Sequence, residues 1–144
     1  GNGNTNEWGE KYVDILNRTM SSDSSVYRSE YDRGCHLEYP GGVCGHSYVD
    51  AEDFWTSLRS SLPSAIFKVE HQIGREDSHL SPRAAVRWSL KGKHDGWGIL
   101  GEPSGADLYV MGVSHAEFGP WGLRREYTLF DETALWKQII IKTG

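Results

Sequence analysis

The spacing of apolar residues changes once along the chain, from a helical period before Pro63 to a strict alternation after it. Near the N-terminus apolar side chains recur every three or four positions, which predicts a helix over residues 7–20. A second such stripe predicts a helix over residues 50–62, with Asp50 as its N-cap and Pro63 at its end. Residues 1–6 are expected to form a loose tail.

Four segments after Pro63 alternate between apolar and polar residues, as strands with one buried face do. They span residues 65–74, 83–93, 107–118 and 123–130. Consecutive strands joined by turns usually pair antiparallel. The sequence therefore predicts an α+β fold, in which helices cover one face of a curved antiparallel sheet.

Shorter elements complete the predicted order. Val26–Tyr31 is expected to form a short helix, and Cys35–Tyr39 a short strand before a turn at Pro40-Gly41-Gly42. A glycine-rich irregular loop separates the second long strand from the third. Asp131 is expected to cap a final helix over residues 132–138.

Length and charge limit the classes of protein to consider. The 144 residues fit a single domain over residues 1–144. A net charge of −5 argues against nucleic acid and against an anionic membrane surface as partners. No segment is apolar for long enough to span a bilayer and no leader peptide is visible, so we expect a cytoplasmic protein. Six Trp, seven Tyr and four Phe predict a large core or an aromatic-lined pocket.

The cysteines and histidines give little sign of redox or metal chemistry. Cys35 and Cys44 flank a turn that could join them, but two free buried thiols are expected, because a domain of this size needs no disulfide. Together with His36 and His46 they match no standard zinc arrangement. Motifs for nucleotide binding and for serine hydrolases are absent. We predict no metal and no cofactor.

The second half of the chain carries a series of short motifs in a specific order. They are Arg83–Leu90, Gly92-Lys93-His94-Asp95-Gly96, Pro103-Ser104-Gly105 and Phe130-Asp131. Over residues 83–138 this order resembles the SnoaL-like polyketide cyclase family, within the nuclear-transport-factor-2-like superfamily. Over residues 7–61 the likeness is architectural and rests on the predicted helices.

The resemblance implies a strongly bent antiparallel sheet, a cone or half-barrel whose pocket is closed by the N-terminal helices. It implies a small apolar molecule as ligand and a homodimer formed through the sheet. It also implies a cofactor-independent cyclase or isomerase, which abstracts a proton next to a carbonyl group by general acid–base chemistry. A non-catalytic ligand-binding or dimerisation domain of the same fold is the alternative, and catalysis stays open at this point.

Alternation along two strands selects His115 and His71 as interior candidates. His115 shares its face with the bulky residues Tyr109, Met111 and Val113, and His71 lies on the only apolar face of its strand. If both faces belong to the concave surface, two imidazoles enter one apolar cavity and can act as base or donor. The ordinary alternative is a hydrogen-bonded histidine of the core or of an interface.

The last strand offers two acids for the acid–base role that the resemblance implies. If the family's acid directly precedes the final helix, it is Asp131. If it lies three residues earlier, this chain has Thr128 there, and Glu126 on the same face can replace it. Asp131 is equally well explained as a helix cap. The predicted catalytic residues are therefore His115, Asp131 and Glu126.

The remaining pocket candidates are aromatic residues and histidines. They are His71, His94, Trp55, Trp88, Trp97 and Tyr109. His94, at the end of a strand, is better suited to ordering the glycine-rich loop than to catalysis. For each aromatic residue taken singly, packing in the core is the ordinary explanation.

Overall fold

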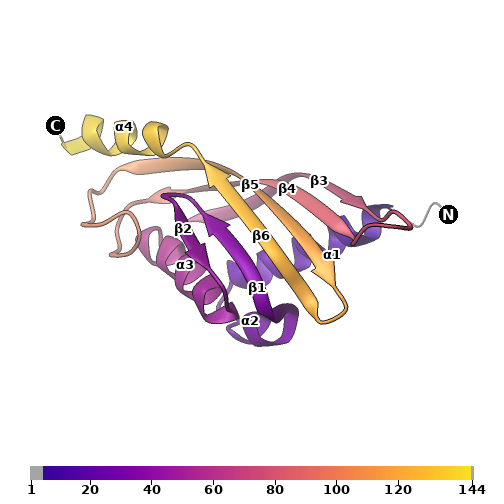
Figure 1. Cartoon of the computed structure of the whole chain (residues 1–144). Coiled ribbons are helices and arrows are strands. Elements are labelled where there is room, and N and C mark those ends of the chain that lie inside the picture. Colours follow the sequence, from indigo (N-terminus) through magenta and orange to yellow (C-terminus); the bar gives the residue numbers. More distant parts are fainter. Residues whose placement is uncertain (1–4, 144) are drawn as a thin grey trace.

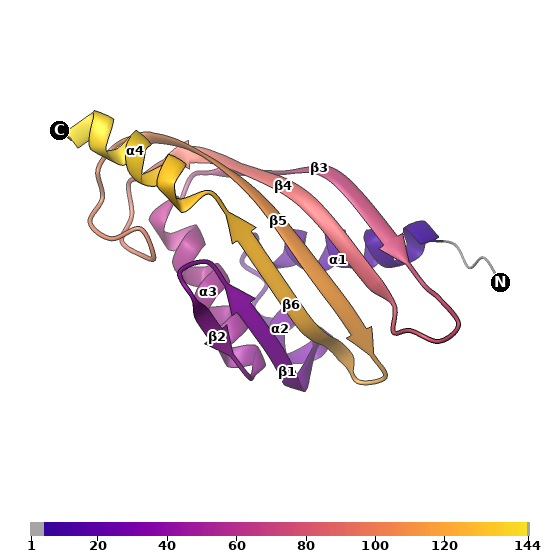
Figure 2. The ribbon, with the colours of Figure 1, turned by 45° about the horizontal axis from the view of Figure 1, so that its top comes forward.

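The computed structural model describes residues 5–143, which form four helices and one six-stranded sheet (Figure 1). The helices are α1 (Thr5–Thr19), α2 (Ser25–Glu30), α3 (Tyr48–Ser61) and α4 (Glu132–Thr143). The strands are β1 (Tyr31–Tyr39), β2 (Val43–Gly45), β3 (Ile66–Arg75), β4 (Arg83–Lys93), β5 (Asp107–Gly119) and β6 (Gly122–Phe130). Their order in the sheet is β2-β1-β6-β5-β4-β3. α1 and α3 lie on one face of the sheet, and α4 follows the end of β6 (Figure 2).

The predicted α+β class is confirmed, and β3 to β6 pair antiparallel with their neighbours in sequence. The sheet is mixed rather than wholly antiparallel, because β1 lies beside β6 and runs parallel to it. Alternating apolar residues show which segments are strands. They do not show that the last strand, β6, lies beside β1, because these two strands are separated in sequence by β2, α3 and β3 to β5.

The predicted boundaries differ from the observed ones at two informative places. α1 begins at Thr5, and residues 1–4 of the predicted tail lie outside the described residues. α3 begins at Tyr48 with Ser47 as its N-cap, so the prediction of Asp50 as the cap is wrong. The Asp50 carboxylate instead lies in the first turn, where it accepts the N–H of His46 at 3.0 Å.

The core lies between the inner face of the sheet and the helices α1 and α3. On this face β5 carries small residues such as Gly112 and Ser114, and Trp88 of β4 fills the space above them. A Cβ atom at Gly112 would overlap the Trp88 ring, so only glycine fits there. The Trp88 indole N–H donates to the Ser114 hydroxyl at 3.0 Å. The bulkier residues Tyr109 and Met111 of β5 consequently face outward.

α4 takes the place of β6 along the first part of β5. β6 ends at Phe130, opposite Gly112, and β5 extends beyond this point. There the Gln138 side chain accepts the backbone N–H of Tyr109 at 2.9 Å and donates to the Tyr109 carbonyl at 3.3 Å. One side-chain amide thus pairs with the edge of β5 as a neighbouring strand would.

Both cysteines are free, but only one of them is buried. Cys35 faces the core, where burial, followed by the charge of Glu126, raises the pKa of its thiol to about 11. Cys44 on β2 is exposed, which corrects the prediction of two buried thiols. Within residues 5–143, no helix combines the length and the apolar character that crossing a membrane requires.

Candidate functional site

Glu126 is a buried carboxylate at the centre of the fold. It lies on the inner face of β6, and its exposed fraction is 0%. Its Oε1 accepts the hydroxyl of Tyr39 at 2.6 Å, the hydroxyl of Tyr31 at 2.8 Å and the indole N–H of Trp55 at 3.2 Å. Its Oε2 accepts the hydroxyl of Tyr12 at 2.6 Å. Four donors therefore replace the water that the carboxylate loses.

The four donors come from three elements that are distant in sequence. Tyr12 lies in α1 and Trp55 in α3, on the faces that these helices turn to the sheet. Tyr31 and Tyr39 lie at the two ends of β1 and are both buried on its inner face, although the pairing of β1 with β6 changes register between Tyr31 and His36. Because β1 is the direct neighbour of β6, both hydroxyls reach Glu126.

Burial dominates the electrostatics of this cluster. Loss of water raises the pKa of Glu126 above its usual value, and the hydrogen bonds from the tyrosines and Trp55 oppose this rise without cancelling it. The pKa values of Tyr12, Tyr31 and Tyr39 are raised well above normal, first by burial and then by the Glu126 charge. The phenols therefore stay protonated and donate, while Glu126 titrates at a higher pH than a solvated carboxyl group.

A row of aromatic rings leads from Glu126 towards the surface. The ring centroid of Trp55 lies 6.0 Å from that of Trp88, and the Trp88 ring lies 5.7 Å from that of Phe67. Trp55 and Trp88 are fully buried, whereas Phe67 is partly exposed. Aromatic side chains thus fill the interior between Glu126 and the surface.

A pocket of about 380 Å³ opens where this row ends, between the last turns of α1 and α3 and the start of β3. Its apolar wall includes Met20, Leu62, Phe67 and Leu90. Its polar wall includes Ser21, Ser22, Arg59 and Ser60. The pocket therefore offers an apolar surface and a cationic group to a small molecule.

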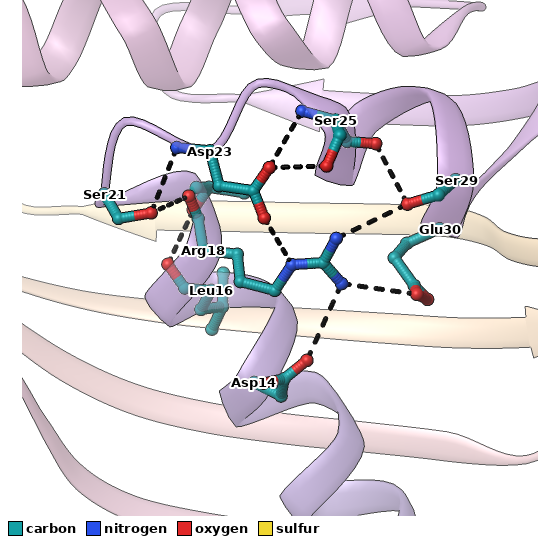
Figure 3. Close-up of polar contacts among 9 residues, drawn as sticks. Asp14, Leu16, Arg18, Ser21, Asp23, Ser25, Ser29 and Glu30 are labelled. Carbon is teal, nitrogen blue, oxygen red and sulfur yellow. Dashed lines mark hydrogen bonds and ion pairs between the residues drawn. The ribbon is translucent and has the colours of Figure 1, made fainter.

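Beside this pocket, Arg18 ties the end of α1 to α2 (Figure 3). Its guanidinium donates to Asp23 at 2.9 Å and lies 3.4 Å from Glu30 and 3.7 Å from Asp14. Asp23 in turn accepts the backbone N–H of Ser25 at 3.0 Å, at the start of α2. Three carboxylates surround Arg18, so its charge is neutralised at the junction of α1 and α2.

The two predicted histidines do not lie in the interior. His115 and His71 are both exposed on the outer face of the sheet, so the prediction that they point into one apolar cavity is wrong. On β5 the face of His115 is turned outward because Trp88 occupies the inner side. On β3 a bulge between Val69 and His71 shifts the alternation, so Val69 faces inward and His71 faces outward.

Of the other predicted residues, Trp55 donates to Glu126 and Trp88 packs beside Trp55, whereas the rest lie away from this cluster. Asp131 Oδ1 accepts the N–H of Ala134 at 3.0 Å, which is the capping role predicted for it. Trp97 and Tyr109 are exposed, at 69% and 44%. His94 is buried in the loop before β5, where its Nδ1 lies 2.9 Å from the Ser104 hydroxyl, and it orders that loop.

The three tyrosines around Glu126 are absent from the residues that the sequence singled out. A signal for them exists, because a tyrosine on an apolar face needs a partner for its hydroxyl. The identity of that partner is not visible in the sequence. Tyr12, Tyr31 and Tyr39 are 114, 95 and 87 positions away from Glu126 along the chain.

Solved structures share this fold at low sequence identity. A candidate SnoaL-like polyketide cyclase from Jannaschia sp. CCS1 has a TM-score of 0.75 and 17% identity, over 96% of this chain and 97% of its own. AclR from Streptomyces galilaeus, a candidate hydroxylase, has a TM-score of 0.75 and 14% identity, over 95% and 83%. IdmH from Streptomyces antibioticus, a candidate polyketide cyclase, has a TM-score of 0.74 and 13% identity, over 92% and 98%.

No protein-family model and no curated protein matches the chain. The fold that the sequence resemblance implied is confirmed, because solved structures named as a SnoaL-like polyketide cyclase and as a polyketide cyclase share it. The names of these neighbours cover more than one kind of reaction. The fold therefore does not decide the chemistry, which has to be argued from the site.

Proposed function

We propose that the protein binds a small apolar carbonyl compound inside the cone and moves a proton on it with Glu126. The observation that carries this proposal is the position of Glu126. Of the three predicted acid–base residues, it alone is buried among hydrogen-bond donors at the centre of the fold, whereas His115 is exposed and Asp131 caps a helix. The reaction class is that of a cofactor-independent cyclase or isomerase.

In this reaction the Glu126 carboxylate takes a proton from the carbon next to the carbonyl group of the ligand, which leaves an enolate. Negative charge then moves from the carboxylate to the enolate oxygen, and the tyrosine hydroxyls that held the first charge donate to the second. In an isomerisation the proton returns to carbon. In a ring closure the enolate carbon attacks a second carbonyl group, and the new alkoxide takes the proton.

The raised pKa of Glu126 supports this role. A general base works best when its pKa lies near the working pH, because it is then both available and basic. A solvated carboxylate has a lower pKa and is therefore a weaker base for removing a proton from carbon. Burial moves the pKa of Glu126 in the favourable direction, and the tyrosines, whose pKa values are raised further, remain donors.

Entry of the ligand is proposed to begin at the 380 Å³ pocket, because Glu126 itself has no exposed surface. Phe67 belongs to the wall of this pocket and is the first ring of the row that ends at Trp55. An aromatic or aliphatic ligand can replace the contacts between these rings as it passes them.

Hydrogen exchange at a simple ketone tests the proposal. In D₂O, the α protons of 2-tetralone are replaced by deuterium, and proton NMR follows the loss of their signals. We expect the wild-type protein to accelerate this exchange and Glu126→Gln to lose about a hundredfold or more, because an amide does not accept the proton. His115→Ala and Asp131→Asn are the controls and should keep the rate. An unchanged rate in Glu126→Gln, or no acceleration by the wild type, would contradict the proposal.

A homodimer through the outer face of the sheet is proposed as the form in solution. Tyr109, Met111 and Leu129 are 44%, 53% and 68% exposed on this face. Tyr109 and Met111 lie on β5, and Leu129 lies on the adjoining strand β6, where it pairs with Val113 of β5. Grouped apolar side chains on a surface mark a site of association. The opposite face is already covered by α1 and α3.

A further inference from the structure

The pocket between the ends of α1 and α3 contains a cation that the fold does not neutralise. Arg59 lines this pocket and is partly buried. Its Nη1 donates to the backbone carbonyl of Thr19 at 3.3 Å, and among the described residues no carboxylate lies within 4.0 Å of it. The nearby Arg18, by contrast, has three carboxylates within that distance (Figure 3). A guanidinium has five N–H donors. Because the bond to Thr19 uses one of them, most of the Arg59 donors remain for a ligand.

Helix ends at this pocket do not cancel the positive charge. The carbonyl groups of a helix C-terminus carry partial negative charge, which would repel an anion if they pointed freely into the pocket. Here Arg59 itself satisfies the Thr19 carbonyl, and the N–H of Gly96 satisfies the Ser61 carbonyl at 3.2 Å. Ser22 and Ser60 also line the pocket and can add hydroxyl donors, whereas the Ser21 hydroxyl already donates to the Arg18 carbonyl at 2.8 Å.

We infer that this pocket binds the carboxylate of a small organic acid whose body is apolar. The guanidinium of Arg59 matches the two carboxylate oxygens in geometry and charge. The apolar body contacts Leu62 and Phe67, which line the same pocket, and points along the row of rings towards Glu126. A volume of about 380 Å³ is within the usual range for such ligands. This inference rests on the proposed function and names the chemical class of its ligand.

The charge of the ligand is tested with two probes of equal shape. 2-Naphthoate carries a carboxylate, and 2-naphthamide carries a neutral amide on the same ring system. Isothermal titration calorimetry at neutral pH should show naphthoate binding to the wild type about tenfold tighter than naphthamide, or more. In Arg59→Gln this preference should vanish while naphthamide binds as before. Arg87→Gln, which removes an exposed guanidinium from β4 on the outer face, should keep the preference.

Two further measurements separate recognition from folding, because Arg59→Gln also removes the bond to Thr19. Arg59→Lys retains the charge without the planar fork, and its preference for naphthoate should lie between those of the wild type and Arg59→Gln. In the wild type, naphthoate should shift the backbone amide signals of Ser21, Ser60 and Ala65 in nitrogen–proton NMR spectra. These three residues line the pocket.

Equal affinity for the two probes, a preference that survives in Arg59→Gln, or signal shifts confined to other surfaces would overturn the inference. Absence of binding at millimolar concentration would overturn it as well. The exchange experiment uses a neutral ketone and reads out Glu126. Failure of that experiment therefore counts against the proposed reaction, whereas failure with naphthoate counts only against an acid as the ligand.

Discussion

A carboxyl group in an apolar core costs several kcal/mol unless hydrogen bonds replace its water. Glu126 receives four such bonds, and each of its partners is buried as well. Removal of the carboxylate would leave three phenols and one indole without their acceptor, at about 1–3 kcal/mol for each group that stays unpaired. These five side chains therefore have to be treated as one unit in any mutational study.

Glu126 should make the folded protein less stable as the pH rises. Its pKa is raised from the ordinary 4.5, so between that value and the raised one the folded state holds a proton that the unfolded state has lost. The free energy of unfolding falls with rising pH in this window, and the loss is complete above the folded-state pKa. Below pH 4.5 both states are protonated and the effect is absent.

Urea unfolding of the wild type and of Glu126→Gln across this window checks the prediction, because glutamine does not titrate. The variant should gain stability relative to the wild type as the pH rises. Glu102→Gln removes an exposed carboxylate and serves as the control. A difference between wild type and Glu126→Gln that does not change with pH would show that the folded-state pKa is not raised.

Among the elements, α4 is attached to the sheet by a side chain rather than by a strand. Gln138 forms both hydrogen bonds to the backbone of Tyr109, and Leu135 and Ile139 are the buried residues of this helix. Trp136, Ile140 and Ile141 remain exposed. The helix is therefore held by few contacts, and the amide of Gln138 protects the part of β5 that β6 does not reach.

Gln138→Leu should loosen the edge of β5 at Tyr109. The leucine fills a similar volume but neither accepts the Tyr109 N–H nor donates to its carbonyl. Because one hydrogen bond contributes roughly 1 kcal/mol, amide exchange of Tyr109 measured by NMR should become about fivefold faster. Lys137→Leu, at the neighbouring exposed position, is the control. Unchanged exchange at Tyr109 in Gln138→Leu would mean that α4 itself, and not the amide, covers this edge.

For the whole molecule, the helices are distributed unevenly over the sheet. α1 and α3 cover the inner face, and α4 packs against one end of β5 (Figure 2). The outer face of β5 and β6 consequently keeps Tyr109, Met111 and Leu129 exposed. Burial of this face against a second copy of the chain would remove apolar surface from water. The gain in free energy is about 25 cal/mol for each square ångström of apolar surface buried.

The purified protein should therefore run as a homodimer of twice 16.2 kDa in light scattering at micromolar concentration. Met111→Lys combined with Leu129→Lys should shift it to a monomer, because each change brings a charge into the apolar contact. Ile66→Lys replaces an equally exposed apolar residue on the edge strand β3 and should leave the dimer intact. A monomeric wild type at this concentration would contradict the prediction.

Local periodicity in the sequence by itself determined most elements of this protein. β4 spans Arg83–Lys93 as predicted, and the stripe that includes Phe54 and Trp55 is buried on α3. This works because the repeat of a helix or strand and the burial of one face are both local properties. The same alternation brought Glu126 into the set of candidate acids, although it left Asp131 beside it.

Only the tertiary structure decided which face of each strand lies inside. On β5 both faces carry apolar residues, and the choice followed from Trp88, whose ring needs the space above Gly112. On β3 a single bulge turned His71 outward. The parallel neighbour of β6 and the tyrosine donors of Glu126 come from segments that fold together only over long distances in sequence. Such contacts depend on packing volume and chain path, which a local pattern of residues does not contain.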